Sequence, residues 1–161
     1  MNALCGLQKS CQFNILQDHV GLISVAHQAV LRLSSFSNMV DMKTTHTSLP
    51  FAGHTLHFVE FDPASFREQD LLWLPHYAQL QHAGRKRKTE HLAGRIAAIY
   101  ALREYGYKCV PAIGELRQPV WPAGVYGSIS HCGTTALAVV SRQPIGIDIE
   151  EIFSAQTARE L

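Results

Sequence analysis

The sequence lacks the patterns that mark several common protein classes. Its four cysteines form no Cys-x-x-Cys pair, and its nine histidines show no His-Glu-x-x-His or other zinc-ligand spacing. No apolar run is long and unbroken enough to span a bilayer, and no basic start followed by an apolar core indicates a signal peptide. We therefore expect a protein of the reducing cytoplasm without membrane insertion, although peripheral association with an inner membrane stays open.

An excess of charge of either sign is also missing. The formal net charge is +1, and aromatic residues are not interleaved with basic ones, which argues against a nucleic-acid partner. With 161 residues, 47% of them hydrophobic and 17% charged, the composition is that of an ordinary globular protein.

Hydrophobic periodicity and turn residues predict a mixed fold. A capped helical pattern runs from Gly84 to Tyr105 and ends at Gly106, and the segment 110–124 is rich in proline and glycine, which predicts a loop. Strands are predicted at 55–61 and near 125–130, 136–141 and 145–150. This order of elements predicts an α/β or α+β fold.

Alternating residues between 145 and 150 predict a strand with two different faces. Ile145, Ile147 and Ile149 take every second position, and Asp148 and Glu150 lie between them. Because side chains on a strand alternate, the isoleucines would bury one face and both carboxylates would project from the other. Such a pair often binds a cation, and oxygen ligands favour magnesium over zinc. The alternative is a solvated edge strand.

A second polar segment precedes it and ends a predicted strand. Ser130, His131 and the turn at Gly133 offer groups that suit a phosphate. Adjacent strand residues face opposite sides, so Ser130 and His131 would not form a hydrogen-bonded nucleophile and base. A nucleophilic Ser130 or Cys132, and a structural turn role for His131, are the alternatives.

Three ordered motifs resemble those of the surfactin-type 4'-phosphopantetheinyl transferases. The paired signature corresponds to Gly-Ser-Ile-Ser-His-Cys at 127–132 and Ile-Gly-Ile-Asp-Ile-Glu at 145–150, and the first motif corresponds to Gly-Glu-Leu-Arg-Gln-Pro-Val-Trp-Pro at 114–122. The resemblance covers about 42–161. It implies magnesium-dependent transfer of the phosphopantetheine arm of coenzyme A to a serine of an apo carrier protein. The implied partners are aryl or peptidyl carrier proteins of enterobactin-type siderophore synthesis, with a synthase complex as a possible assembly.

The same resemblance implies roles for particular residues. Asp148 and Glu150 would bind Mg²⁺, and Ser130 and His131 would hold the ribose phosphate and adenine end of coenzyme A. The family's third motif, an aromatic residue followed by x-x-Lys-Glu, is absent from the sequence. It would supply a third acidic ligand and the general base, and Glu151 would point the wrong way to replace it. We therefore expect this chain to be a weak or inactive enzyme.

A run of four cations, Arg85 to Lys88, opens the predicted helix. Cations are disfavoured at a helix N-terminus, and a bound anion would relieve that cost. In the resembled family this segment contacts coenzyme A, and a lysine often precedes the proline of the first motif, where this sequence has Gln118. The candidate coenzyme A ligands are therefore Arg85, Lys86, Lys88, Arg95 and Arg117. A solvated charged turn is the alternative.

The resembled family consists of two similar α/β halves with the site between them. On that pattern, 39–142 would be the first half and 143–161 the truncated start of the second, magnesium-binding half, while 1–38 would be an extension outside the working protein. The missing half would leave apolar surface uncovered and a strand edge unpaired. A remnant that binds only coenzyme A or a carrier protein is the alternative to an enzyme.

Overall fold

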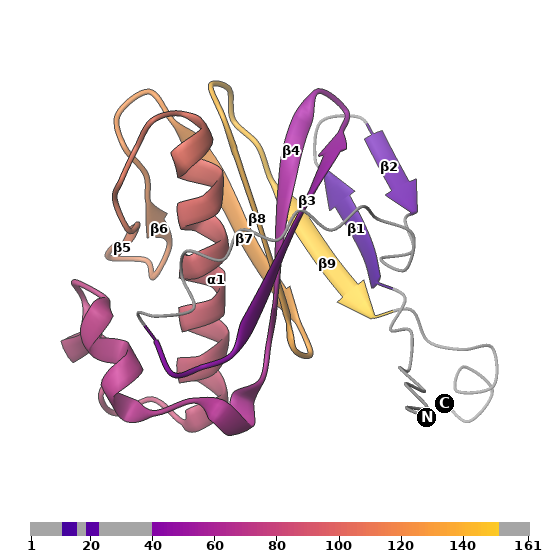
Figure 1. The fold of residues 1–161 in the computed structure, drawn as a ribbon. Coiled ribbons are helices and arrows are strands. Elements are labelled where there is room, and N and C mark those ends of the chain that lie inside the picture. The colour runs from indigo at the N-terminus through magenta and orange to yellow at the C-terminus, as the bar shows by residue number, and fades with distance from the viewer. Residues whose placement is uncertain (1–10, 16–18, 23–39, 152–161) are drawn as a thin grey trace, which may run out of the picture.

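The computed structural model describes residues 11–15, 19–22 and 40–151, which form an α+β fold with antiparallel strands and one long helix (Figure 1). The strands are β1 (Cys11–Ile15), β2 (His19–Leu22), β3 (Thr44–Phe51), β4 (His54–Phe61), β5 (Ala112–Ile113), β6 (Pro119–Val120), β7 (Tyr126–Cys132), β8 (Thr135–Ser141) and β9 (Ile147–Glu151). The helices are α1 (Arg85–Glu104) and three 3₁₀ helices, η3 (Pro63–Ser65), η4 (Glu68–Trp73) and η5 (Tyr77–Leu80). No helix in these ranges is apolar and long enough to cross a membrane.

The central sheet has the strand order β3-β4-β8-β7, and each neighbouring pair is antiparallel. Strands β4, β7, β8 and β9 confirm the four predicted strands to within a few residues. Strand β3 was not predicted. It joins β4 through Ala52 and Gly53, whose positive φ angles of 49° and 79° are those of a type I′ hairpin turn.

Helix α1 covers one face of the central sheet (Figure 1). Gly84 takes its N-cap position, and Gly106 follows it with a φ of 82°, so both predicted boundaries are confirmed. Every residue from Leu92 to Leu102 is buried. A helix is apolar all round only where protein surrounds it, and here Phe66, Leu71 and Leu74 join the helix in the same core cluster.

The central strand β8 divides two cores. Its Ala138 and Val140 belong to the core shared with α1, whereas its Leu137 and Val139 belong to a second core that includes Ile147 and Ile149. All of β8 is buried because both faces of the sheet are covered, by α1 on one side and β9 on the other. Strand β9 is therefore held on the sheet by its isoleucines.

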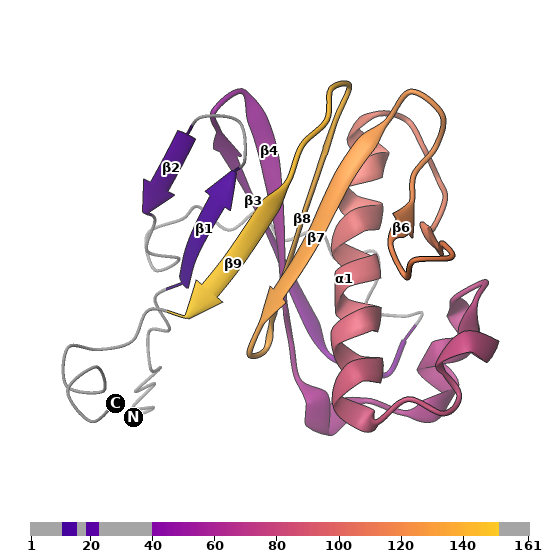
Figure 2. The same ribbon diagram turned by 180° about the vertical axis from the view of Figure 1, so that it is seen from behind.

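Strand β9 belongs to a separate sheet of order β2-β1-β9, which lies on the side away from α1 (Figures 1 and 2). Strand β1 pairs antiparallel with β9 from Cys11 opposite Glu151 to Ile15 opposite Ile147. The expectation of an unpaired strand edge is therefore wrong for this edge, since a segment near the start of the chain occupies it. Whether residues 1–38 belong to the working protein stays a prediction.

Close packing of α1 on β7 gives a test of the first core. A methyl group added at Gly94 would lie 2.9 Å from Ile129 Cγ2. We expect Gly94→Ala to lower the free energy of unfolding by about 1 kcal/mol, because overpacking of about 1–3 kcal/mol outweighs the gain in helix propensity of about 1 kcal/mol. Urea denaturation measures the change. Ile129→Leu removes the Cγ2 branch and should turn the same substitution into a stabilising one. A stabilising Gly94→Ala in the unchanged background would contradict this packing.

Candidate functional site

Two of the three carboxylates of β9, Asp148 and Glu150, project from the face opposite the second core. Ile147 and Ile149 are 7% and 2% exposed, whereas Asp148 and Glu150 are exposed to solvent. The alternation predicted for this strand is therefore confirmed. Two adjacent exposed carboxylates are a donor set that suits Mg²⁺, which commonly takes one or two carboxylates together with phosphate oxygens and water.

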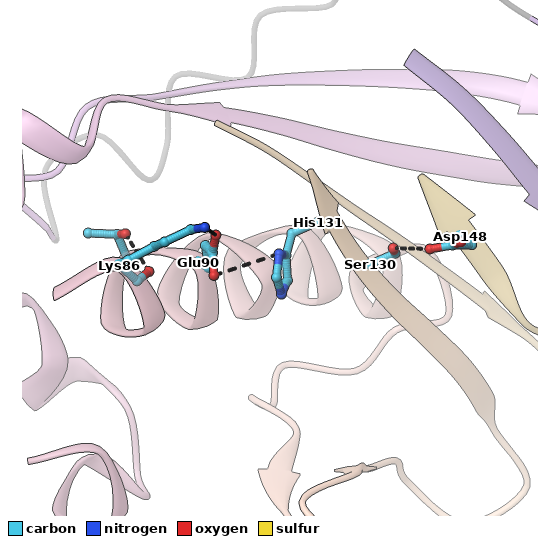
Figure 3. Close-up of polar contacts among 6 residues, drawn as sticks. Lys86, Glu90, Ser130, His131 and Asp148 are labelled. Atoms are coloured by element: carbon cyan, nitrogen blue, oxygen red, sulfur yellow. Dashed lines mark hydrogen bonds and ion pairs between the residues drawn. The ribbon is translucent and has the colours of Figure 1, made fainter. Parts of the chain in front are cut away.

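Serine hydroxyls of β7 connect this strand to β9, although the two strands belong to different sheets. Ile147 N–H donates to Ser128 Oγ at 3.1 Å, and Ile149 N–H donates to Ser130 Oγ at 3.2 Å. The Ser130 hydroxyl in turn donates to Asp148 Oδ1 at 3.0 Å (Figure 3). The predicted coenzyme-binding Ser130 thus contacts the predicted metal ligand Asp148.

His131 points to the other side of β7, toward α1 (Figure 3). Its Nδ1 lies 3.8 Å from Glu90 Oε2, and Glu90 Oε1 lies 3.9 Å from Lys86 Nζ. The His131 side chain is 49% exposed and that of Glu90 only 15%. As argued from strand geometry, Ser130 and His131 diverge, and Ser130 has no adjacent base in His131. Glu90, which sequence reasoning did not single out, joins His131 to the basic run.

Two cations of the basic run hold α1 to the segment of 3₁₀ helices. Arg85 Nη2 donates to the carbonyl oxygens of Pro63 at 2.8 Å and Phe66 at 3.1 Å. Lys88 Nζ lies 2.9 Å from Glu68 Oε2, with the lysine side chain only 9% exposed. Both side chains therefore have structural partners. A role in binding coenzyme A for either one stays a prediction.

Arg95 is also engaged inside the fold. Its side chain is buried, its Nε donates to Pro111 O at 2.8 Å, and its Nη2 donates to Ala112 O at 3.3 Å. Burial lowers the pKa of Arg95 to about 10. The guanidinium of this α1 residue thus fixes the loop after the helix.

Two other arginines line one cavity of about 340 Å³. Arg87 comes from α1 and Arg117 from the turn between β5 and β6, and His82 and Ile113 also line the cavity. Arg117 was a predicted ligand, but Arg87 was passed over. Successive residues of a helix point about 100° apart, so only some of four consecutive cations can face one cavity. The sequence shows the cluster but not which member faces inward.

The electrostatic environment of His91 indicates a positive potential in this region. Burial lowers the pKa of His91 to about 3, with further lowering from the charges of Arg95, His76, Arg87 and His131. Its Nε2 lies 2.8 Å from His76 Nε2, so the two rings share one hydrogen bond. Burial disfavours a charge of either sign, but the charges of Arg95 and Arg87 among these causes make the potential positive, and a positive potential attracts an anion. Arg87 and His131 contribute to the same field, although they come from different elements.

A larger cavity, of about 650 Å³, lies at the other end of α1. Its walls include Trp73, Ile99, Tyr107 and Val110, and none of the predicted site residues lines it. Size alone therefore does not locate the site. The cations and carboxylates around β7 and β9 do so better, because they have the chemistry of a phosphate and metal site.

The carboxylates fit magnesium only in part. Within residues 11–15, 19–22 and 40–151, no group of three or more acidic, histidine or cysteine side chains could surround an ion. Asp148 and Glu150 would therefore hold Mg²⁺ together with oxygens of a bound phosphate and water. This is consistent with the absence of the third motif from the sequence.

Comparison with known proteins gives a family match over part of the chain. Residues 76–141, which include all of α1, β7 and β8, match the N-terminal domain of the 4'-phosphopantetheinyl transferases. The chain is therefore a partial-length homologue of these transferases.

Among curated proteins, the chain is similar to enterobactin synthase component D. The Escherichia coli K12 protein is 96% identical over 120 residues, which are 74% of this chain and 58% of that protein. The Salmonella typhimurium protein is 68% identical over 120 residues, 74% of this chain and 51% of that protein. The 4'-phosphopantetheinyl transferase PptT of Mycobacterium tuberculosis is 37% identical over 70 residues, 40% of this chain and 31% of that protein. The chain thus spans little more than half of the enterobactin synthase relatives.

Proposed function

We propose that this chain carries the coenzyme A-binding and magnesium-binding part of a 4'-phosphopantetheinyl transferase. The observation that carries the proposal is the placement of polar side chains by β7, which directs Ser130 toward the carboxylate Asp148 of β9 and His131 toward α1. Two arginines, Arg87 of α1 and Arg117 of the turn between β5 and β6, line one cavity. A substrate with a ribose phosphate and a pyrophosphate presents separate anionic groups that could meet a cationic cavity and a bound cation.

The proposed reaction transfers phosphopantetheine to a serine of an apo aryl or peptidyl carrier protein of siderophore synthesis. The serine oxygen bonds to the phosphorus next to pantetheine, the bond to adenosine 3',5'-bisphosphate breaks, and a base takes the hydroxyl proton. Bound Mg²⁺ would neutralise charge on the pyrophosphate and the leaving oxygen. In this chain, Asp148 and Glu150 would hold the ion, while Arg87, Arg117 and His131 would orient the nucleotide end.

A transfer assay tests this function directly. The purified chain is mixed with coenzyme A, Mg²⁺ and an apo carrier protein, and mass spectrometry follows addition of the arm. Asp148→Ala should abolish any transfer. Binding of coenzyme A without transfer would favour a second candidate, a binding remnant, which is supported by the missing aromatic-x-x-Lys-Glu motif. Failure to bind both coenzyme A and the carrier protein would contradict both candidates.

Arg87 should matter for coenzyme A and Arg85 should not. We expect Arg87→Gln to raise the dissociation constant for coenzyme A about tenfold, the effect of losing roughly 1.4 kcal/mol of charge-assisted hydrogen bonding. Isothermal titration calorimetry without metal measures the affinity. Arg85→Gln is the matched control, because Arg85 donates to the carbonyls of Pro63 and Phe66. It should lower the melting temperature and leave the affinity unchanged, and the reverse result would exchange their roles.

A further inference from the structure

The cavity of about 650 Å³ at the C-terminal end of α1 is lined by none of the residues assigned to the transfer reaction. Its volume is within the range of about 300–1,000 Å³ that is typical of small-molecule sites. One wall begins at Gly106, whose φ of 82° ends the helix and turns the chain. Another includes Trp73, the last residue of η4. Separate segments of the chain therefore enclose the cavity.

Most of the lining is apolar and is anchored in the first core. Ile99 is 4% exposed and belongs to that core, and Trp73, Tyr107 and Val110 are half-buried and pack against it. Because each of these side chains both contacts the core and lines the cavity, its position is largely fixed before a ligand arrives. The two aromatic rings favour an aromatic ligand, since contacts between rings stabilise a complex beyond the burial of apolar area.

The polar part of the lining is cationic. Arg103 and Lys108 are exposed at the cavity, and none of the described residues that line it is acidic. Glu104 is the nearest carboxylate along the chain, but its Oε1 lies 3.1 Å from His57 Nε2 and is therefore directed toward β4. In the described part of the chain, Lys108 belongs to none of the ion pairs. Its charge is therefore available to an acidic group.

The end of α1 does not cancel this positive charge. A helix C-terminus carries the equivalent of about half a negative charge, which is located on its last carbonyl groups. Here Tyr105 N–H and Tyr107 N–H donate to Leu102 O at 3.0 and 3.1 Å, and Gly106 N–H donates to Arg103 O at 3.0 Å. These bonds occupy carbonyls at the end of the helix, so the two cations dominate the local potential.

We propose that this cavity is a second ligand site, which binds an aromatic organic acid. The ring of the ligand packs against Trp73 and Tyr107, and its acidic group contacts Lys108 and Arg103. An uncharged aromatic molecule would leave the cations unpaired, and an aliphatic acid would lack the contacts between rings. The inference goes beyond the proposed function and does not depend on it, because its test requires no transfer activity.

The test uses the full chain and two fluorescent probes with the same rings, anilinonaphthalene sulfonate and the uncharged phenylnaphthylamine. We expect fluorescence titration to show that the sulfonate binds about tenfold more tightly, because it alone forms a charge-assisted contact. Lys108→Gln should remove most of this difference and leave the affinity for the uncharged probe unchanged. Excess coenzyme A should not displace the sulfonate, because the proposed coenzyme A ligands do not line this cavity.

Lys43→Gln is the matched control, because it removes the charge of another exposed lysine, outside the cavity, and keeps the Lys43 N–H that donates to Ser65 Oγ. It should leave both affinities unchanged. Bound sulfonate should also slow the alkylation of Cys109 by iodoacetamide, whereas Cys132 on β7 should react as before, and peptide mass spectrometry follows both thiols.

Four results would each overturn the inference: equal affinities for the two probes, an equal loss in Lys43→Gln, unchanged alkylation of Cys109, or displacement of the sulfonate by coenzyme A. Displacement would place the probe in the cavity that Arg87 and Arg117 line. A sulfonate affinity that falls as the chain dimerises would also overturn it, because a second copy of the chain would then occupy the cavity.

Discussion

Asp70→Ala is expected to lower the free energy of unfolding by about 3–4 kcal/mol, because three backbone N–H groups would lose a charged acceptor. The Asp70 residue is 3% exposed. Its Oδ1 accepts from Asp41 N–H at 2.7 Å, and its Oδ2 accepts from Met42 N–H at 3.1 Å and Arg67 N–H at 2.9 Å. The carboxylate therefore ties the chain entering β3 to the start of η4. Alanine would leave these donors without their charged acceptor, and that of Met42 is buried.

Urea denaturation at neutral pH measures this loss, and two further variants divide it into parts. Asp70→Asn keeps one oxygen acceptor and should fall between the wild-type chain and Asp70→Ala. Asp41→Asn alters an exposed side chain that contacts Gln69 but keeps the Asp41 amide, so it should change stability by less than about 0.5 kcal/mol. A change of that small size in Asp70→Ala would mean that water or other groups satisfy the three donors.

Local sequence patterns correctly predicted those elements whose structure is determined by their own residues. Gly84 and Gly106 bound α1 because they suit its caps, and the isoleucines of β9 alternate because one face is buried. Strand β3 was missed because its threonines, His46 and Pro50 lack a clear alternation of apolar and polar residues. Its pairing with β4 along the full length decides its structure instead, and that is a long-range effect.

The candidate site likewise has one part that the sequence predicted correctly and one part that it did not. The pairing of Asp148 with Glu150 and the divergence of Ser130 from His131 follow from strand geometry alone, and the structure confirms both placements. The sequence did not show which groups the side chains of the basic run contact. The carbonyl of Phe66 and the carboxylate of Glu68 approach α1 only in the folded chain. Long side chains with distant partners cannot be sorted from their order in the sequence.

Acidification is expected to destabilise the chain strongly between about pH 6.5 and pH 4. Burial lowers the pKa of both His46 and His57 to about 4, and the neighbouring His57 lowers that of His46 further. Above pH 6.5 the histidines are neutral in both states, so stability is fully present. Below it the unfolded chain binds protons that the folded chain does not, and stability falls by up to about 1.4 kcal/mol per pH unit for each histidine.

The structure gives the reason for this resistance to protonation. His46 Nε2 lies 2.9 Å from His57 Nδ1, and the His46 ring stacks on Tyr100 with centroids 3.7 Å apart. A proton added to either ring would put a charge in the core, where burial withholds water from it, and protonation of both rings would set two charges against each other. His57 Nε2 lies 3.1 Å from Glu104 Oε1, and burial raises the pKa of Glu104, which offsets part of the loss at low pH.

Urea denaturation at pH 7, 6 and 5 measures the slope of stability with pH. We expect a loss of about 3–4 kcal/mol between pH 6.5 and pH 5 from the pair, less the contribution of Glu104. His46→Gln can still accept or donate a hydrogen bond at His57 but does not titrate in this range, so it should remove about half of the pair's contribution to the slope, while the buried His91 and His76 keep theirs. His82→Gln is the control, because His82 is exposed and should leave the slope unchanged. Equal slopes in all three proteins would mean that His46 gains a proton as easily in the folded chain as in the unfolded one.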